Sequence, residues 1–293
     1  MSKFVLYALL ALATFTGSAS AATAGPSIAG GKFEVTCKPH SIPDQAIDPI
    51  VSPGVASAHE HTFFGSKGLT NTSTPASLQA STAGTTCVLP QDTAAYWLPV
   101  ACNGPCTNAI TPTNVVQPVK IFGYYFGTKG VAVGQYPANL QMVGGNAHAT
   151  TPPTTKQMIE FSCGNGGSHH SPVRTYPYDC TAANGVSGTD GVVAVVLFPY
   201  CQDSLGVVGY GGSTGACPTG STTLGQVQIH VHYGSNTSGF QTGSKLNFTS
   251  GPYYTFHGDW MNGWKQTKLH SLVSGCLDIN KDCGFLTTSN PGP

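Results

Sequence analysis

Charged side chains are scarce in this chain of 293 residues. Asp, Glu, Lys and Arg together make up 8% of it, and the formal net charge is zero, whereas an ordinary globular domain carries about 25% charged residues. A nucleic-acid binder needs a basic patch, so this composition excludes that class of partner. It also excludes an acidic disordered tail. Uncharged polar residues and glycine must cover the surface, a composition associated with proteins that act outside the cell on neutral polymers such as polysaccharides.

Long apolar runs are also lacking after the first residues. Residues 4–15 are apolar, follow Lys3 and precede the small residues 18–21, which is typical of a secretory signal peptide cleaved after Ala21. A membrane span needs about 20 apolar residues, and this run is shorter. We therefore expect residues 1–21 to be removed and residues 22–293 to form one secreted, extracellular domain that does not associate with a membrane.

Amphipathic helical patterns are rare, while glycine (37 residues) and proline (21 residues) are abundant. This pattern predicts an all-β fold, a single-domain β-sandwich or jelly roll with long loops, and we expect a monomer. Long surface loops are expected at 70–86 and 206–225, and one helix at 264–273. The almost wholly apolar strand 191–198 should be covered on both faces. Strands are predicted at 33–37, 96–100, 119–126, 158–163, 191–198, 226–233 and 253–256.

Ten cysteines in an exported chain predict a disulfide framework of up to five bridges. Sequence alone leaves most of the connectivity open. Two local pairs are expected because each closes a short loop: Cys102 with Cys106, and Cys276 with Cys283. A metal site at Cys102 and Cys106 is disfavoured, because it would need further ligands and a reducing compartment.

Two pairs of histidines are each separated by one residue: His59 with His61, and His230 with His232. In an extended segment, side chains two residues apart project from the same face. Each pair can therefore close on one metal ion or one anionic group. The alternative for His59 and His61 is a hydrogen-bonded structural pair that packs beside Phe63.

Several segments together resemble the domain-of-unknown-function 1996 family of secreted proteins, known from fungi and bacteria. The resemblance covers almost the whole mature chain, and its distinctive elements are a His-x-His, a Tyr-Trp-x-Pro and a His-Gly-Asp motif. One departure is the histidine-free run 206–216, where the family places a Ser-His motif. The matching segments are 48–51, 53–54, 57–61, 64–65, 92–99, 124–125, 142–145, 161–163, 198–203, 217–218, 257–260 and 263–264.

The resemblance implies secretion and an association with cell-wall glycans. Its third motif contributes His257, so a metal site is predicted at His59, His61 and His257, with one divalent transition metal such as zinc or copper as cofactor. Asp259 can be a further ligand or can orient an imidazole. A copper centre that uses an N-terminal histidine is excluded, because the predicted cleavage leaves Ala22 at the N-terminus.

Without a metal, glycan hydrolysis would need two carboxylates. The candidate catalytic residues within the matched motifs are Asp92, Asp203 and Asp259. Asp48, which precedes a proline, is interpreted as a turn residue, and Glu60 should face away from the histidines. Candidate sugar-stacking side chains are Tyr96, Trp97, Tyr125 and Trp260, with a place in the core as the alternative for each. Surface positions are expected for His40, His148, His270 and the pair at 169–170.

Two functional interpretations follow from the sequence. In the first, a secreted all-β protein binds extracellular glycan or cell wall and cleaves it at the histidine-rich centre. In the second, a non-catalytic wall or surface protein uses the same histidines for structure or to sequester metal. An open polar cleft at the three imidazoles would favour the first interpretation.

Overall fold

The computed structural model describes residues 30–42, 45–153, 158–164, 173–181, 191–212, 215–234 and 240–293. Strands make up most of its regular structure, and the predicted all-β, disulfide-stabilised fold is confirmed. The predicted signal peptide at 1–21 and the histidines at 169–170 lie outside the described residues.

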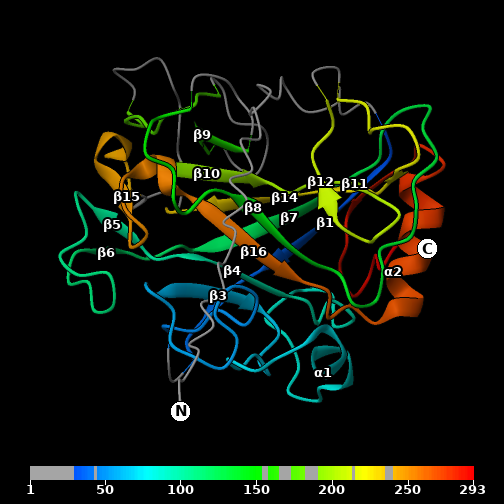
Figure 1. The fold of residues 1–293 in the computed structure, drawn as a ribbon, viewed down its shortest axis with the longest axis horizontal. Helices are drawn as coiled ribbons and strands as arrows, with labels where there is room; N and C mark the ends of the chain where they lie inside the picture. The colour runs from blue at the N-terminus through cyan, green and yellow to red at the C-terminus, as the bar shows by residue number, and fades with distance from the viewer. Residues whose placement is uncertain are drawn as a thin grey trace, which may run out of the picture.

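The larger sheet has six strands, which Figure 1 shows behind the strand β16 (His257–Met261). Its edge strand β17 (Asp282–Phe285) runs parallel to β1 (Lys32–Cys37), and the other neighbouring strands are antiparallel. All six residues of β10 are buried, so the prediction for 191–198 is confirmed. In spatial order the strands are β17 (Asp282–Phe285), β1 (Lys32–Cys37), β7 (Lys120–Phe126), β14 (Gln226–His232), β10 (Val192–Leu197) and β9 (Ile159–Cys163).

The second sheet has five antiparallel strands. In spatial order they are β2 (Pro39–His40), β3 (His61–Gly65), β4 (Ala95–Pro99), β16 (His257–Met261) and β8 (Gln141–Gly145). Two three-stranded sheets flank these larger ones. They consist of β12 (Val208–Gly209), β11 (Cys201–Gln202) and β13 (Thr222–Thr223), and of β15 (Leu246–Phe248), β5 (Ala101–Asn103) and β6 (Val115–Val116).

The two large sheets pack face to face as a sandwich (Figure 1). Phe33 and Val196 from the larger sheet meet Tyr96 and Trp260 from the smaller one in a single buried cluster. The sheets approach closely at Gly258, where an added Cβ would lie 2.7 Å from Val196 Cγ1. Glycine therefore stands between His257 and Asp259 because the core face of β16 has no room for a side chain.

A smaller hydrophobic cluster lies on the outer face of the five-stranded sheet. Phe63, Ala95, Trp97 and Met261 from the strands pack there against Ile42, Ile47, Leu69 and Leu78 from the segments before and after β3. Chain segments around β3 therefore cover this outer face, and the face is not simply solvent-exposed.

Three predicted segments differ from the structure. Residues 253–256 are not a strand: Tyr253–Thr255 form a 3-10 turn after Pro252, and the strand begins at His257. The expected loop 70–86 contains the helix α1 (Pro75–Ala80), capped by Thr74. The expected loop 206–225 contains β12 and β13.

The expected helix is present as α2 (Gln266–Leu272) and continues as a π-helical turn, Val273–Leu277. A second 3-10 turn spans Gly243–Lys245. In the part of the chain that the structure describes, no helix is long and apolar enough to cross a membrane.

All ten cysteines are paired. The two predicted local bridges, Cys102–Cys106 and Cys276–Cys283, are confirmed. The other three bridges, which the sequence left open, are Cys37–Cys87, Cys163–Cys180 and Cys201–Cys217.

Candidate metal centre

Two strands of the smaller sheet and the segment before one of them bring the histidines together. His61 is the first residue of β3 and His257 the first residue of β16, with β4 between the two strands. His61 lies on the same face as Phe63, and His257 on the same face as Asp259 and Met261, because alternate residues of a strand share a face. His59 lies just before β3. The His-x-His and His-Gly-Asp motifs thus meet on one outer sheet face.

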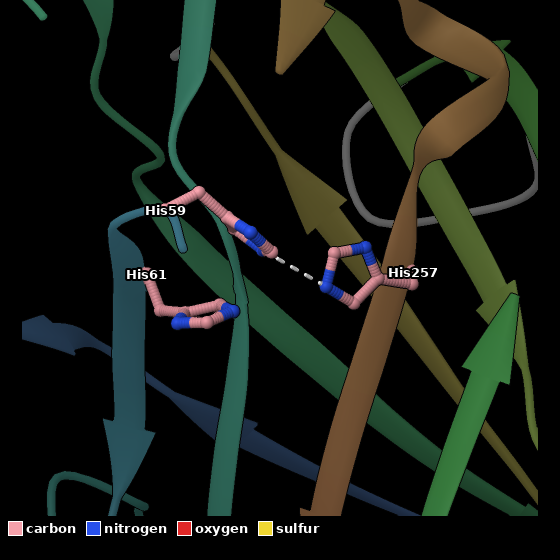
Figure 2. Close-up of side chains that lie close together, drawn as sticks. All are labelled: His59, His61 and His257. Atoms are coloured by element: carbon pink, nitrogen blue, oxygen red, sulfur yellow. Dashed lines mark hydrogen bonds between the residues drawn. The ribbon is translucent and has the colours of Figure 1, made fainter. Parts of the chain in front are cut away.

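The three imidazoles lie close enough to share one ion (Figure 2). One potential ligand atom from each of His59, His61 and His257 lies within 4.8 Å of the other two. His59 Nε2 and His257 Nε2 are 3.2 Å apart. Two nitrogens bound tetrahedrally to one zinc, at about 2.0–2.1 Å each, would lie roughly 3.3 Å apart. The two rings form a hydrogen bond in the structure, and the same spacing fits two ligands of one ion.

Backbone carbonyls orient two of the rings. His61 Nδ1 donates to the carbonyl of Ile47 at 3.0 Å, and His257 Nδ1 donates to the carbonyl of Thr255 at 2.9 Å. In each neutral ring Nε2 then carries the lone pair. An N–H to carbonyl bond of this kind is the usual way in which a metal-binding histidine is held in its tautomer. His61 Nε2 is buried and has no hydrogen-bond partner among the described residues.

Burial keeps the three imidazoles neutral. It lowers the pKa of His257 to about 4 and, together with the neighbouring His257, lowers the pKa of His59 to about 4. Burial and the two other imidazoles hold the pKa of His61 well below its usual range. Because metals bind the unprotonated ring, all three are available as ligands at neutral pH.

The centre opens on a cavity of about 540 Å³. His59 and His257 line it, while His61 is fully buried behind them. Asp48 and the exposed His148 also line the cavity, and His148 is a fourth imidazole that sequence analysis placed on the surface. An ion at the three histidines would thus be reached from solvent between His59 and His257.

Two carboxylates lie beside the histidines. One potential ligand atom from each of Asp48, His61 and Asp259 lies within 4.8 Å of the other two. Asp259 is fully buried, and neither carboxylate oxygen has a hydrogen-bond partner among the described residues. Burial, reinforced by the charge of Asp48, raises the pKa of Asp259 well above its usual range.

Asp92 lies elsewhere, in the core beside the Cys37–Cys87 disulfide. Its carboxylate accepts hydrogen bonds from the Tyr96 hydroxyl at 2.9 Å and the Ala94 amide at 3.2 Å. The Tyr125 hydroxyl lies 2.8 Å from that of Tyr96. Burial raises the pKa of Asp92 to about 8, although both hydrogen bonds act to lower it. This placement points to a structural role for Asp92 in the interior.

The candidate sugar-binding aromatics are also in the interior. Tyr96, Trp97, Tyr125 and Trp260 are all completely buried. The indole nitrogen of Trp260 donates to the Tyr125 hydroxyl at 3.2 Å, so both rings belong to the network that ends at Asp92. None of the four presents a ring face to a ligand, and their placement is that of core residues.

The remaining candidates lie apart from the centre. Asp203 is exposed in a turn, where Oδ1 accepts from the amides of Leu205 and Val207. His230 and His232 lie on β14 of the larger sheet, with ring contacts to Tyr124 at 4.4 Å and to Phe122 at 4.9 Å. The second His-x-His pair therefore does not join the first.

A family comparison covers the whole of this centre. A model of the family described as a domain of unknown function, DUF1996, matches residues 48–264, which include the three histidines and both carboxylates of the candidate centre. The chain belongs to this family. No curated protein and no solved structure matches it.

Proposed function

We propose that this member of the DUF1996 family is an extracellular protein that binds one divalent transition metal ion, zinc or copper, and acts there on a polysaccharide. The observation that carries the proposal is the convergence of three neutral imidazoles beside an open cavity. Five disulfides support an extracellular location, because such bridges persist in oxidising compartments. The site is built from one chain, and we propose that it works as a monomer.

His59, His61 and His257 would hold the ion. Three protein ligands with a solvent-facing side are typical of catalytic rather than closed structural metal sites. Bound there, a metal ion supplies Lewis acidity and lowers the pKa of a bound water. The carbonyls of Ile47 and Thr255 fix the orientation of two rings, and the buried position of His61 excludes water from the rear of the site.

The cavity continues beyond the metal centre, which supports a chain-like substrate. A second cavity of about 470 Å³ shares Gly145, Asn146 and His148 with the first and extends to Tyr254. Among the described residues that line the two cavities there is no lysine or arginine, and Asp48 is the one carboxylate. The lining residues that the structure describes thus carry little charge, which supports a neutral polymer. Tyr254, which sequence analysis did not single out, is the aromatic ring among them.

Hydrolysis by two carboxylates alone has less support. Asp92 and Asp203 lie away from the cavity, and Asp259 is fully buried beneath it. The non-catalytic alternative, a wall-binding protein that only sequesters metal, shares the same centre. Detection of polysaccharide cleavage products therefore distinguishes an enzyme from a non-catalytic binding protein.

The test combines elemental analysis with a polysaccharide panel. We expect purified protein to bind about one zinc or copper ion, His257→Ala to lose it, and His270→Ala, an exposed position on α2, to retain it. Hydrolysed or oxidised oligosaccharides, detected by mass spectrometry, should appear with the wild type and with His270→Ala, and should be absent with His257→Ala. Tyr254→Ala should weaken polysaccharide binding without loss of the ion.

Two outcomes would contradict the proposal. If the wild type binds no transition metal, the three imidazoles have a structural role. If the wild type binds the metal but leaves every polysaccharide intact, the protein is a non-catalytic binding protein and not an enzyme.

A further inference from the structure

Asp259 is a buried carboxyl group without a hydrogen-bond partner among the described residues. Asp48, only 4% exposed, approaches it, with potential ligand atoms of the two carboxylates and His61 within 4.8 Å of one another. Removing a carboxylate from water is costly unless it is paired or bound to a metal.

Among the described residues, no side-chain cation forms an ion pair with either carboxylate. The ion pairs that the structure describes join Lys32 to Glu34 and to Asp282, far from this site in the larger sheet. The two carboxylates therefore have no positive charge beside them among the described residues, and a bound cation would supply it.

We infer that Asp48 and Asp259 complete the metal centre, so that the ion bound by His61 is held by carboxylate oxygen as well as by imidazole nitrogen. His61 belongs to both groups of potential ligands, the three histidines and the pair of carboxylates. Its Nε2 is the ring nitrogen that remains for an ion, because Nδ1 donates to the Ile47 carbonyl. This inference rests on the proposed function, because it assigns further ligands to the same ion.

The turn at Ile47 and Asp48 is built for this role. The Ile47 carbonyl orients His61, and the next residue places its carboxylate beside the same ring. Asp48 Oδ1 accepts from the amides of Ile50 at 3.1 Å and Val51 at 3.0 Å. These bonds fix the Asp48 side chain and do not use its second carboxylate oxygen, Oδ2. The turn thus positions two parts of one centre.

A mixed set of ligands narrows the choice of metal. Carboxylate oxygen is a good ligand for zinc and other divalent ions, whereas Cu(I) prefers sulfur and nitrogen. Two carboxylates also balance the charge of one divalent ion, which three neutral imidazoles alone would leave uncompensated. We therefore assign the centre to a divalent ion rather than to Cu(I).

The test uses zinc titration of metal-free protein by calorimetry. Asp259→Asn and Asp48→Asn keep the shape of each side chain, and in Asp48→Asn the amide oxygen can still accept from the two turn amides. We expect each variant to bind zinc about 10–100-fold more weakly, the usual effect of removing a group that supports a metal site. Asp203→Asn, whose carboxylate holds an exposed turn, should bind as the wild type does.

Thermal unfolding of the metal-free proteins separates ligation from folding. Asp259→Asn should melt close to the wild-type temperature, because it replaces a buried carboxyl group without hydrogen-bond partners among the described residues by an amide of the same shape. If Asp259→Asn fails to fold, the zinc affinity of Asp48→Asn tests the inference instead. Wild-type zinc affinity in both variants, with binding lost in His61→Ala, would overturn this inference and leave the proposed function standing. A wild type that binds no zinc or other divalent ion would overturn both.

Discussion

At the scale of single residues, the histidines could be predicted and their carboxylate neighbours only in part. The His-x-His spacing indicates that two imidazoles share a face, and His257 joins them across β4. Asp48 was interpreted as a turn residue, which it is, but the same side chain also faces His61 and Asp259. A sequence pattern typical of a turn predicts the local backbone conformation, but it does not predict the tertiary contacts of the side chain.

The aromatic candidates show the same limit. Tyr96 and Trp260 lie in strands whose buried face is set by pairing between β4 and β16. Sequence identifies such residues as large and rigid, yet does not say whether they face the core or a groove. The structure places them in the core and leaves Tyr254 in the groove.

The buried Asp92 gives a prediction about pH. Its pKa is about 8 in the folded protein, against about 3.9 in an unfolded chain. Between these values the folded state holds the proton more tightly than the unfolded state does. The contribution of Asp92 to stability is therefore fully present below about pH 4 and is lost as the pH rises toward 8, at about 1.4 kcal/mol per pH unit.

Urea unfolding from pH 4 to pH 8 measures this effect. The difference in free energy of unfolding between the wild type and Asp92→Asn should change steadily across that range, in favour of the variant at high pH. Since all other titrating groups are common to both proteins, the difference isolates Asp92. Parallel pH profiles would show that Asp92 is ionised in the folded protein.

At the scale of elements, most strands could be predicted because their apolar runs are short, β-branched and bounded by turn residues. The segment 253–256 was predicted wrongly because its aromatic and β-branched residues favour a strand. Pro252 instead precedes a 3-10 turn, and the strand begins at His257. That shift matters for the site, since it makes His257 the first residue of β16, where its ring reaches the cavity.

The glycine in β16 gives a second prediction. A Cβ at Gly258 would lie 2.7 Å from Val196 Cγ1 and 3.2 Å from Leu98 Cδ2. Gly258→Ala must therefore push β16 away from the larger sheet, at a cost of about 1–3 kcal/mol. Because His257 and Asp259 flank this position, we also expect weaker zinc binding.

Gly209→Ala is the matched control, because an added Cβ at this position in β12 meets no atom within 4 Å. Denaturant unfolding and zinc titration of both variants compare the two strands. Equal stability and equal zinc affinity in the two variants would show that β16 has more room than its contacts with Val196 indicate.

At the scale of the whole molecule, the cysteine count predicted a disulfide framework but not its connectivity. Pairs four and seven residues apart could be assigned because each closes a short loop. Cys37 and Cys87 are separated by 50 residues. Sequence offers no rule that joins them, since the pairing depends on where β1 and the segment after α1 meet in space.

The lengths of the loops that these bridges close predict how much each stabilises the fold. In the chain-entropy account, a loop of about 50 residues contributes roughly 4 kcal/mol and a loop of about five residues roughly 2 kcal/mol. The paired change Cys37→Ala with Cys87→Ala should therefore lower the free energy of unfolding about twice as much as Cys102→Ala with Cys106→Ala.

The long bridge also holds the segment 38–86, which contains the histidine pair and the turn carboxylate of the metal centre. Its removal should weaken zinc binding as well, whereas removal of the short bridge should leave it unchanged. Denaturant unfolding and zinc titration of the two double variants measure both effects, and an equal loss of stability in the two would contradict the loop-length argument.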